Sequence, residues 1–329
     1  MSLVKLRVSI IGTLTLLIAL STLFFTIILS FLGITNLLSL AVLVVLFNIA
    51  QWLLGPYMIN AIYRVREISA SDRPELHSMV QRLSERLGLK MPKVMLADIP
   101  IPNAFAYGSP IAGSRVAVTS GLLRELEGEE VEAVVGHELG HLKNRDVQVM
   151  MFASILPAIF YFVGTSMMMS AYYGGGRQRE GSAAPWLIGI ASMVIYYILT
   201  LFVLGLSRLR EYYADQRSAS IVDDGARKLS EALAKIASSS SKMRLHKQAP
   251  TSLNSFKALF IEDPDKAASD QAAISSARMF KTDQQLVNEI LSRKVSATAQ
   301  VLELFSTHPN IIKRLQALQG SVQSRVGDL

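Results

Sequence analysis

Long stretches without a charged residue dominate this sequence of 329 residues. No charge occurs between Arg7 and Arg64, from Val147 to Tyr173, or from Gly181 to Ser207. The first stretch can hold two helices, roughly 8–31 and 37–57, and each later stretch can hold one, since a membrane-spanning helix needs about 20 mostly apolar residues. We therefore expect about four transmembrane helices. The first is expected to be an anchor, because it is longer than the apolar core of a cleavable signal peptide.

The basic residues gather at the ends of these stretches. Such residues near the ends of a span favour the cytoplasmic side. Both termini and the polar regions 58–146 and 208–329 are therefore expected on the cytoplasmic side of a cell membrane. Basic residues that flank membrane segments account for the net charge of +7. We therefore expect a lipid bilayer as a partner and no nucleic acid. The basic residues concerned are Lys5, Arg7, Arg64, Arg66, Lys143, Arg145, Arg208 and Arg210.

The same division predicts the organisation of the chain. Residues 1–57 form an N-terminal transmembrane hairpin and 58–146 the first cytoplasmic part. Residues 147–207 form a second transmembrane hairpin and 208–329 the second cytoplasmic part. Helical periodicity and short β-like runs in the polar parts predict a mainly α polytopic membrane protein with a small β element. The absence of cysteine excludes disulfides and every Cys-based metal site or nucleophile.

The sequence VVGHELGHLKNRD contains the pattern H-E-x-x-H. His137 and His141 are four residues apart and therefore lie on one face of a helix. Two imidazoles at this spacing can bind one Zn²⁺, and Glu138 between them can act as the general base on a water molecule. The alternative is a pair of structural histidines on an ordinary helix face.

Catalytic zinc usually has a third protein ligand. The candidates are His77, His246, His308 or a carboxylate. The sequence SRLREYYADQRSAS supplies Glu211 and Asp215 on one helix face. We expect Glu211 to be the third ligand and Asp215 to accept a hydrogen bond from a zinc-bound histidine, His137 in the first place.

The predicted membrane spans favour Glu211 as the third ligand. Two spans separate His141 from Glu211, so the chain leaves the cytoplasmic side and returns to it. A helical hairpin in lipid can therefore join two halves of one site. Glu211 could otherwise be a juxtamembrane charge that pairs with Arg208 or Arg210.

Four motifs together resemble the HtpX family of membrane-bound zinc metallopeptidases, which are related to the gluzincin-type CAAX prenyl proteases. They are HELGHLKNRD, REYYAD, NAFAYG and STHPNIIKRL, and they occur in the family order. The resemblance implies a zincin-like domain with a small antiparallel β-sheet. It implies His137, His141 and Glu211 as zinc ligands and Glu138 as the base.

The resemblance further implies that Asn103, Ala104 and Phe105 lie on an edge strand that binds the substrate backbone, the pairing described for peptide recognition at sheet edges. His308 is a candidate for contacting the oxyanion or the substrate. The alternative is that its segment only caps the next helix. Asn310 stands where the family usually has a second proline, and the region 239–299 is longer than expected.

The resulting interpretation is a zinc-dependent membrane endopeptidase with one Zn²⁺ per chain, acting on protein or peptide substrates in protein quality control and the stress response. One alternative is the processing of a single defined or lipidated protein. Another is a non-catalytic scaffold or transporter, which the lack of ionisable residues inside the spans disfavours. The sequence defines neither the substrates nor an oligomeric state.

Overall fold

The computed structural model describes residues 37–173, 184–245 and 282–327. The first predicted span, 8–31, and more than half of the polar region 239–299 lie outside the described residues. The helices are α2 (Leu37–Tyr63), α3 (Pro74–Leu87), α4 (Ser120–Glu125), α5 (Gly128–Lys143), α6 (Asp146–Tyr173), α7 (Ala184–Ile221), α8 (Gly225–Leu245), α10 (Asp283–Leu291), α11 (Ala297–Leu304) and α12 (Ile311–Gly327). The strands are β1 (Val65–Glu67), β2 (Lys93–Ala97), β3 (Ala104–Ser109) and β4 (Gly113–Thr119).

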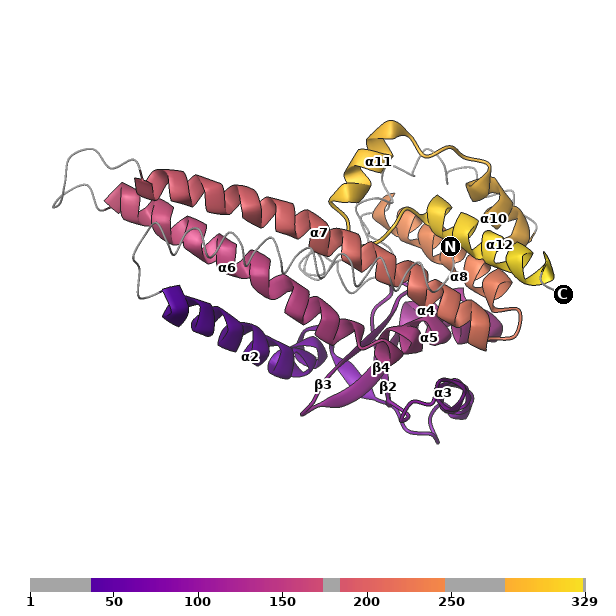
Figure 1. Ribbon diagram of the computed structural model, residues 1–329. Coiled ribbons are helices and arrows are strands. Elements are labelled where there is room, and N and C mark those ends of the chain that lie inside the picture. The colour runs from indigo at the N-terminus through magenta and orange to yellow at the C-terminus, as the bar shows by residue number, and fades with distance from the viewer. Residues whose placement is uncertain (1–36, 174–183, 246–281, 328–329) are drawn as a thin grey trace.

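Helices α6 and α7 pack side by side as a long arm, and α2 lies along α6 (Figure 1). Both α6 and α7 are long and apolar enough to cross a membrane. The 28 residues of α6 correspond to about 42 Å, more than the hydrocarbon core of a bilayer. Helix α2 covers the second predicted span and continues to Tyr63. The structure therefore supports a membrane hairpin in the middle of the chain.

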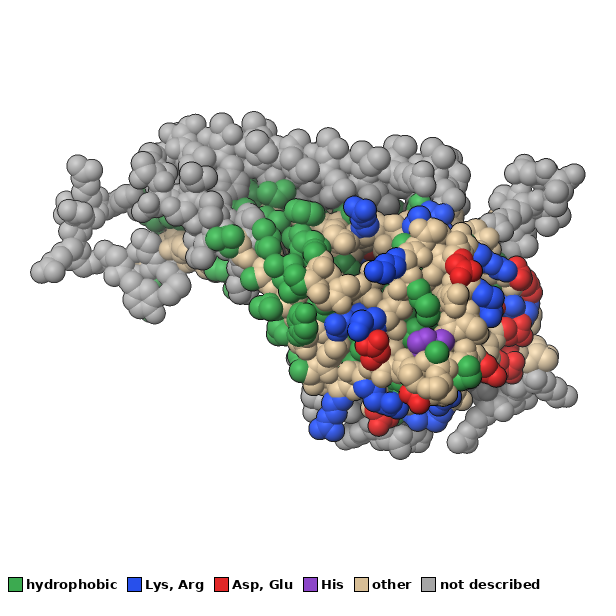
Figure 2. All heavy atoms as spheres, turned by 90° about the horizontal axis from the view of Figure 1, so that it is seen from below, with side chains coloured by type: hydrophobic (Ala, Val, Ile, Leu, Met, Phe, Trp, Pro, Cys, Tyr) green, Lys and Arg blue, Asp and Glu red, His purple; other side chains and the backbone are tan. Residues whose placement is uncertain are grey.

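The surface of the molecule divides in the same way. Figure 2 shows hydrophobic side chains along the arm, whereas charged side chains concentrate at the opposite end. Large hydrophobic side chains that would be unfavourable in water are exposed on the arm, as expected for lipid contact. They include Phe152, Tyr161 and Phe162 on α6 and Trp186, Leu187, Val194 and Tyr197 on α7.

The four-stranded sheet has the order β1-β2-β4-β3. Strands β1 and β2, and β3 and β4, are antiparallel, but β2 and β4 are parallel. The prediction of an antiparallel sheet was therefore wrong, since the sheet is mixed. The connection 98–103 carries the chain past the end of β4, so that β4 returns between β2 and β3. Gly121 allows this crossing, because a Cβ atom there would lie 2.1 Å from the Pro100 carbonyl oxygen.

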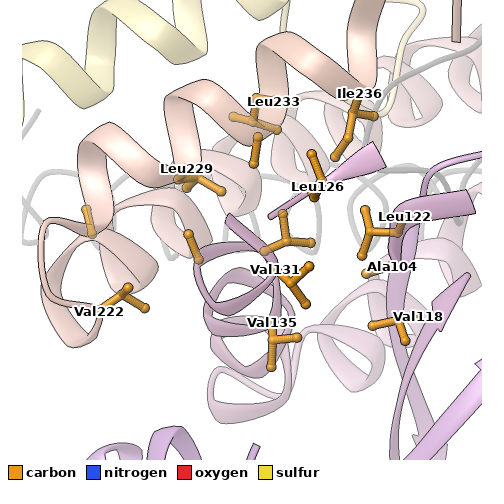
Figure 3. Close-up of a cluster of buried hydrophobic side chains, with 14 of the residues drawn as sticks. Ala104, Val118, Leu122, Leu126, Val131, Val135, Val222, Leu229, Leu233 and Ile236 are labelled. Atoms are coloured by element: carbon orange, nitrogen blue, oxygen red, sulfur yellow. The ribbon is translucent and has the colours of Figure 1, made fainter. Parts of the chain in front are cut away.

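The main core lies where α5 packs between the sheet and α8. Figure 3 shows Val131 and Val135 of α5 facing Leu229 and Leu233 of α8, with Leu122 beside them. These side chains are buried, and burying each one contributes about 1.5–3 kcal/mol relative to exposure. The core thus fixes α5, which carries the H-E-x-x-H pattern.

Helix α5 begins with a capping box, in which the Glu127 side chain accepts from the N–H of Glu130 and the Glu130 side chain accepts from the N–H of Glu127. At its other end, Arg145 adopts a φ of 55°, which breaks the helix and lets α6 start in a new direction. By contrast, α7 continues without a break from the apolar arm to Ile221. The arm and the polar end of the molecule are therefore connected by one rigid helix.

Candidate metal centre

Three side chains from two helices converge at the base of the arm. His137 and His141 project from α5, and their Nε2 atoms lie 3.1 Å apart. Glu211 projects from α7, with Oε2 at 3.5 Å from His137 Nε2 and Oε1 at 3.5 Å from His141 Nε2. All three side chains are largely buried. The structure thus brings together the residues predicted as metal ligands, although the two histidines lie at least 70 residues before Glu211 in the chain.

The orientation of both imidazoles is set by carboxylates on their far sides. His137 Nδ1 lies 2.9 Å from Asp215 Oδ1, and His141 Nδ1 lies 2.6 Å from Asp146 Oδ2. An ionised carboxylate only accepts hydrogen bonds, so these contacts favour a proton on each Nδ1. With a metal ion bound in place of a second proton, each ring would present the lone pair of Nε2 to the shared point between the helices.

The geometry of these atoms fits a zinc ion. Two nitrogen lone pairs that face each other repel unless a proton or a metal cation lies between them. Around a tetrahedral ion with bonds of about 2.0–2.1 Å, two ligand atoms are about 3.3 Å apart. The three distances of 3.1, 3.5 and 3.5 Å match that spacing, and two histidines with one carboxylate are a ligand set of catalytic zinc.

The charge around the site also favours a cation. Burial lowers the pKa of His137, but the hydrogen bonds to Asp215 and Glu211 outweigh burial and raise that pKa to about 10. The carboxylates therefore stabilise positive charge at this point.

Two arginines, the buried Arg314 and the partly buried Arg210, hold these carboxylates in place, and sequence reasoning predicted this role for neither. Arg314 of α12 donates from Nε and Nη2 to the two carboxylate oxygens of Asp215, at 2.9 and 2.6 Å. Arg314 Nη1 also lies 3.5 Å from Glu211 Oε2. On the other side, Arg210 Nε lies 3.0 Å from Asp146 Oδ1. Each histidine is thus supported by a carboxylate, and each carboxylate by an arginine.

Asp146 was likewise not singled out from the sequence. It follows the break at Arg145 and begins α6, so its side chain points back to His141. Its position in the quoted motif, five residues after His141, is the signal that could have found it.

Glu138 is buried beside the two histidines, with 4% of its surface exposed. Its Oε2 accepts a hydrogen bond of 2.8 Å from the amide of Ala106 on β3. Burial raises the pKa of Glu138, and the neighbouring histidines oppose that change. A carboxyl group with a raised pKa is suited to accept and return a proton near neutral pH.

A cavity of about 280 Å³ opens beside these residues. Ala104, Phe105 and Ala106 of β3 line it, together with Thr307 and His308. His308 is buried, and its Nδ1 lies 3.3 Å from Glu211 Oε2.

Asn103 lies outside the lining of this cavity. It precedes β3 and is buried, and its backbone N–H donates to Thr119 Oγ1. The structure therefore places it as a structural neighbour of β4.

His77, one of the alternative ligands, lies on α3 and not among the residues that line the cavity. Its Nε2 is 2.8 Å from the Ile68 carbonyl oxygen, so it links α3 to the end of β1. His246 lies outside the described residues.

Comparisons with known proteins identify the family of the chain. The sequence model of Peptidase family M48 matches residues 70–322. The chain is 36% identical over 282 residues to a protease HtpX homolog of Thermoplasma acidophilum, covering 84% of this chain and 82% of that protein. It is 38% identical over 299 residues to a protease HtpX homolog of Aeropyrum pernix, covering 90% of this chain and 89% of that protein.

Among solved structures, the crystal structure of S. mikatae Ste24p superposes with a TM-score of 0.54 at 18% identity, covering 96% of this chain and 67% of that chain. This likeness concerns the fold. The fold and the group formed by His137, Glu138 and His141 together define a metallopeptidase. The chain belongs to peptidase family M48, as a homologue of the HtpX proteases.

Proposed function

We propose that this protein is a zinc-dependent membrane endopeptidase that hydrolyses membrane or membrane-associated proteins as part of protein quality control. One observation supports the proposal above all others. The triangle of His137, His141 and Glu211 lies beside the buried carboxyl group of Glu138, at the base of the apolar arm. It combines a binding site for one zinc ion with a proton acceptor.

The roles of the residues follow from their positions. A zinc ion supplies Lewis-acid chemistry, which lowers the pKa of a bound water molecule to about 7 and polarises a carbonyl group. Glu138 takes a proton from the attacking water and returns it to the leaving amine. His308, next to Glu211 at the edge of the cavity, is placed to donate to the oxyanion or to contact the substrate.

Strand β3 offers a backbone surface for the substrate. Among the described strands it pairs only with β4, and the amide of Ala106 points away from β4 toward Glu138. Residues two apart in a strand point the same way, so the backbone groups of Ala104 face the cavity too. A peptide that pairs with this edge is held mainly by main-chain hydrogen bonds, with little dependence on its sequence. Such recognition suits the removal of many different damaged proteins.

The location of the cavity supports substrates near the bilayer. Val147 and Met150 from the start of α6 and Ser207 from α7 belong to its lining. We propose that the catalytic part faces the cytoplasm at the surface of the cell membrane. A polypeptide that emerges from the bilayer would reach the metal directly.

Purified protein tests the proposal through its metal content and its cleavage of casein, with and without a chelator. Glu138→Gln should retain zinc but lose activity by orders of magnitude, because an amide cannot accept the proton. Glu132→Gln is the matched control, since Glu132 lies on the same helix and its side chain pairs with the exposed Arg82. Substantial activity in Glu138→Gln would refute the assignment of the base.

The quality-control role has a separate test. One membrane protein is offered in folded form and in a destabilised variant, in the same nanodiscs. Faster cleavage of the destabilised variant is expected. Equal rates would argue against quality control while leaving the peptidase assignment intact.

A further inference from the structure

Helix α11 exposes an unusual number of large apolar side chains. Val301, Leu302, Leu304 and Phe305 have exposed fractions of 57%, 49%, 51% and 67%. We call these four residues the α11 apolar face. A contiguous apolar patch on a protein surface marks a site that another molecule covers.

The inward side of the same helix is polar. Glu303 is buried, with 6% of its surface exposed. Its carboxylate accepts a hydrogen bond of 3.2 Å from the backbone N–H of Asn310 and forms an ion pair with Lys313 of α12. A surface helix in water normally turns its apolar side inward and its polar side outward. The orientation of α11 is the reverse, and the contacts of the buried Glu303 carboxylate with Asn310 and Lys313 fix it.

The position of α11 along the arm is also fixed. Figure 1 places α11 beside α7, where the arm joins the rest of the protein. Arg208 of α7 donates from Nη1 to the carbonyl oxygens of Glu303 and Ser306, at 2.8 Å each. Arg208 is the first charged residue after the uncharged stretch of α7. The end of α11 therefore lies at the level where α7 leaves its apolar stretch.

A second cavity, of about 390 Å³, lies between these elements. Leu201 and Phe202 line it from the apolar part of α7, whereas Arg208, Lys313 and Glu303 line its polar part. This change from apolar to charged side chains within a few residues matches the boundary between acyl chains and headgroups.

We propose that the α11 apolar face is immersed in the cytoplasmic surface of the lipid bilayer, next to the end of α7. The proposal rests on the proposed function in one respect, because it takes α7 as a membrane span. Exposed apolar residues of α7 at the same end, Ile198 at 44% and Leu201 at 39%, extend the surface into the bilayer. A helix with one apolar face at the membrane surface is a known mode of membrane contact.

The contact has a consequence for the metal site. Two residues after Phe305 the chain reaches Thr307 and His308, which line the catalytic cavity. Lipid under α11 would therefore hold this wall of the cavity at a fixed height above the bilayer.

Because the chain has no cysteine, single cysteines allow a direct test in phosphatidylcholine nanodiscs. Phe305→Cys is labelled with bimane, and its quenching is measured with doxyl groups on the lipid chains and with iodide in the water. Tyr197→Cys, on α7 and 61% exposed, is the control for a residue in lipid. Ser220→Cys, exposed near the C-terminal end of α7, is the control for a residue in water.

The expected result is a loss of Phe305→Cys fluorescence with doxyl lipid comparable to that of Tyr197→Cys, and protection from iodide. Ser220→Cys should show the opposite pattern. Quenching of Tyr197→Cys but not of Phe305→Cys by doxyl lipid would overturn the proposal and leave the membrane span intact. Protection of Phe305→Cys from both quenchers would also overturn it, since a second copy or another part of the chain would then cover α11. Lack of doxyl quenching at both positions would overturn the span and the proposal together.

Discussion

Arg314 provides a severe test of how the site is held together. Its side chain is almost fully buried, with 2% exposed, and it bonds both carboxylate oxygens of Asp215. Arg314→Met removes the guanidinium group and keeps most of the side-chain volume. Among the described residues, His137 would then be the one cationic group in contact with the buried carboxylate of Asp215.

The size of the effect follows from this burial. Removing one partner of a buried ion pair destabilises a protein by about 3–5 kcal/mol. With an unfolding entropy of about 2.1 cal/mol/K per residue, that range corresponds to a fall in Tm of roughly 4–7 °C for a chain of 329 residues. Zinc should reduce the loss, because its charge compensates the neighbouring carboxylates.

The measurement is thermal unfolding in nanodiscs, followed by intrinsic fluorescence with and without added zinc. Arg82→Met is the control, because Arg82 and Glu132 form an exposed pair at 3.4 Å, and such pairs contribute about 0–1 kcal/mol. The double variant Arg314→Met/Asp215→Asn should recover part of the loss, since it also removes the unpaired charge. A Tm for Arg314→Met equal to that of Arg82→Met would refute this account of Arg314.

Two further predictions concern the histidine supports and the arm. Asp215→Asn and Asp146→Asn should each weaken zinc binding about 10–100-fold, because the amide no longer fixes the histidine tautomer as a carboxylate does; zinc affinities equal to wild type would contradict the assigned supports. Single cysteines in place of Tyr172 and Ser220, both exposed and at opposite ends of the arm, should react with an impermeant maleimide from opposite sides of sealed membranes. Labelling of both from one side would show that α6 and α7 do not cross the bilayer.

The local part of the site was predictable because it follows from helix geometry. His137, Glu138 and His141 needed only the helical spacing of one short segment. Glu211 needed one further step, namely that two spans return the chain to the same side. Both inferences use distances along one or two continuous helices, which a sequence encodes directly.

The remaining parts depend on tertiary packing. The sequence around Arg314 does not indicate that α12 folds back onto α7. Lys313 and Arg314 are neighbouring basic residues, but of the two only Arg314 is nearly fully buried. The prediction of an antiparallel sheet failed for a similar reason. The β3–β4 hairpin is local, whereas the pairing of β2 with β4 depends on how the connection 98–103 crosses the sheet.

The zinc content of Glu211→Ala tests the central claim most directly. Wild type, Glu138→Gln and Glu211→Ala are purified in parallel, and bound zinc is measured by mass spectrometry across a series of chelator concentrations. Glu138→Gln should retain zinc like wild type. Glu211→Ala should lose it at far lower chelator concentrations, because two neutral histidines alone bind zinc weakly. If Glu211→Ala holds zinc as tightly as wild type, the third ligand lies elsewhere, and the joining of α5 and α7 in one metal site is wrong.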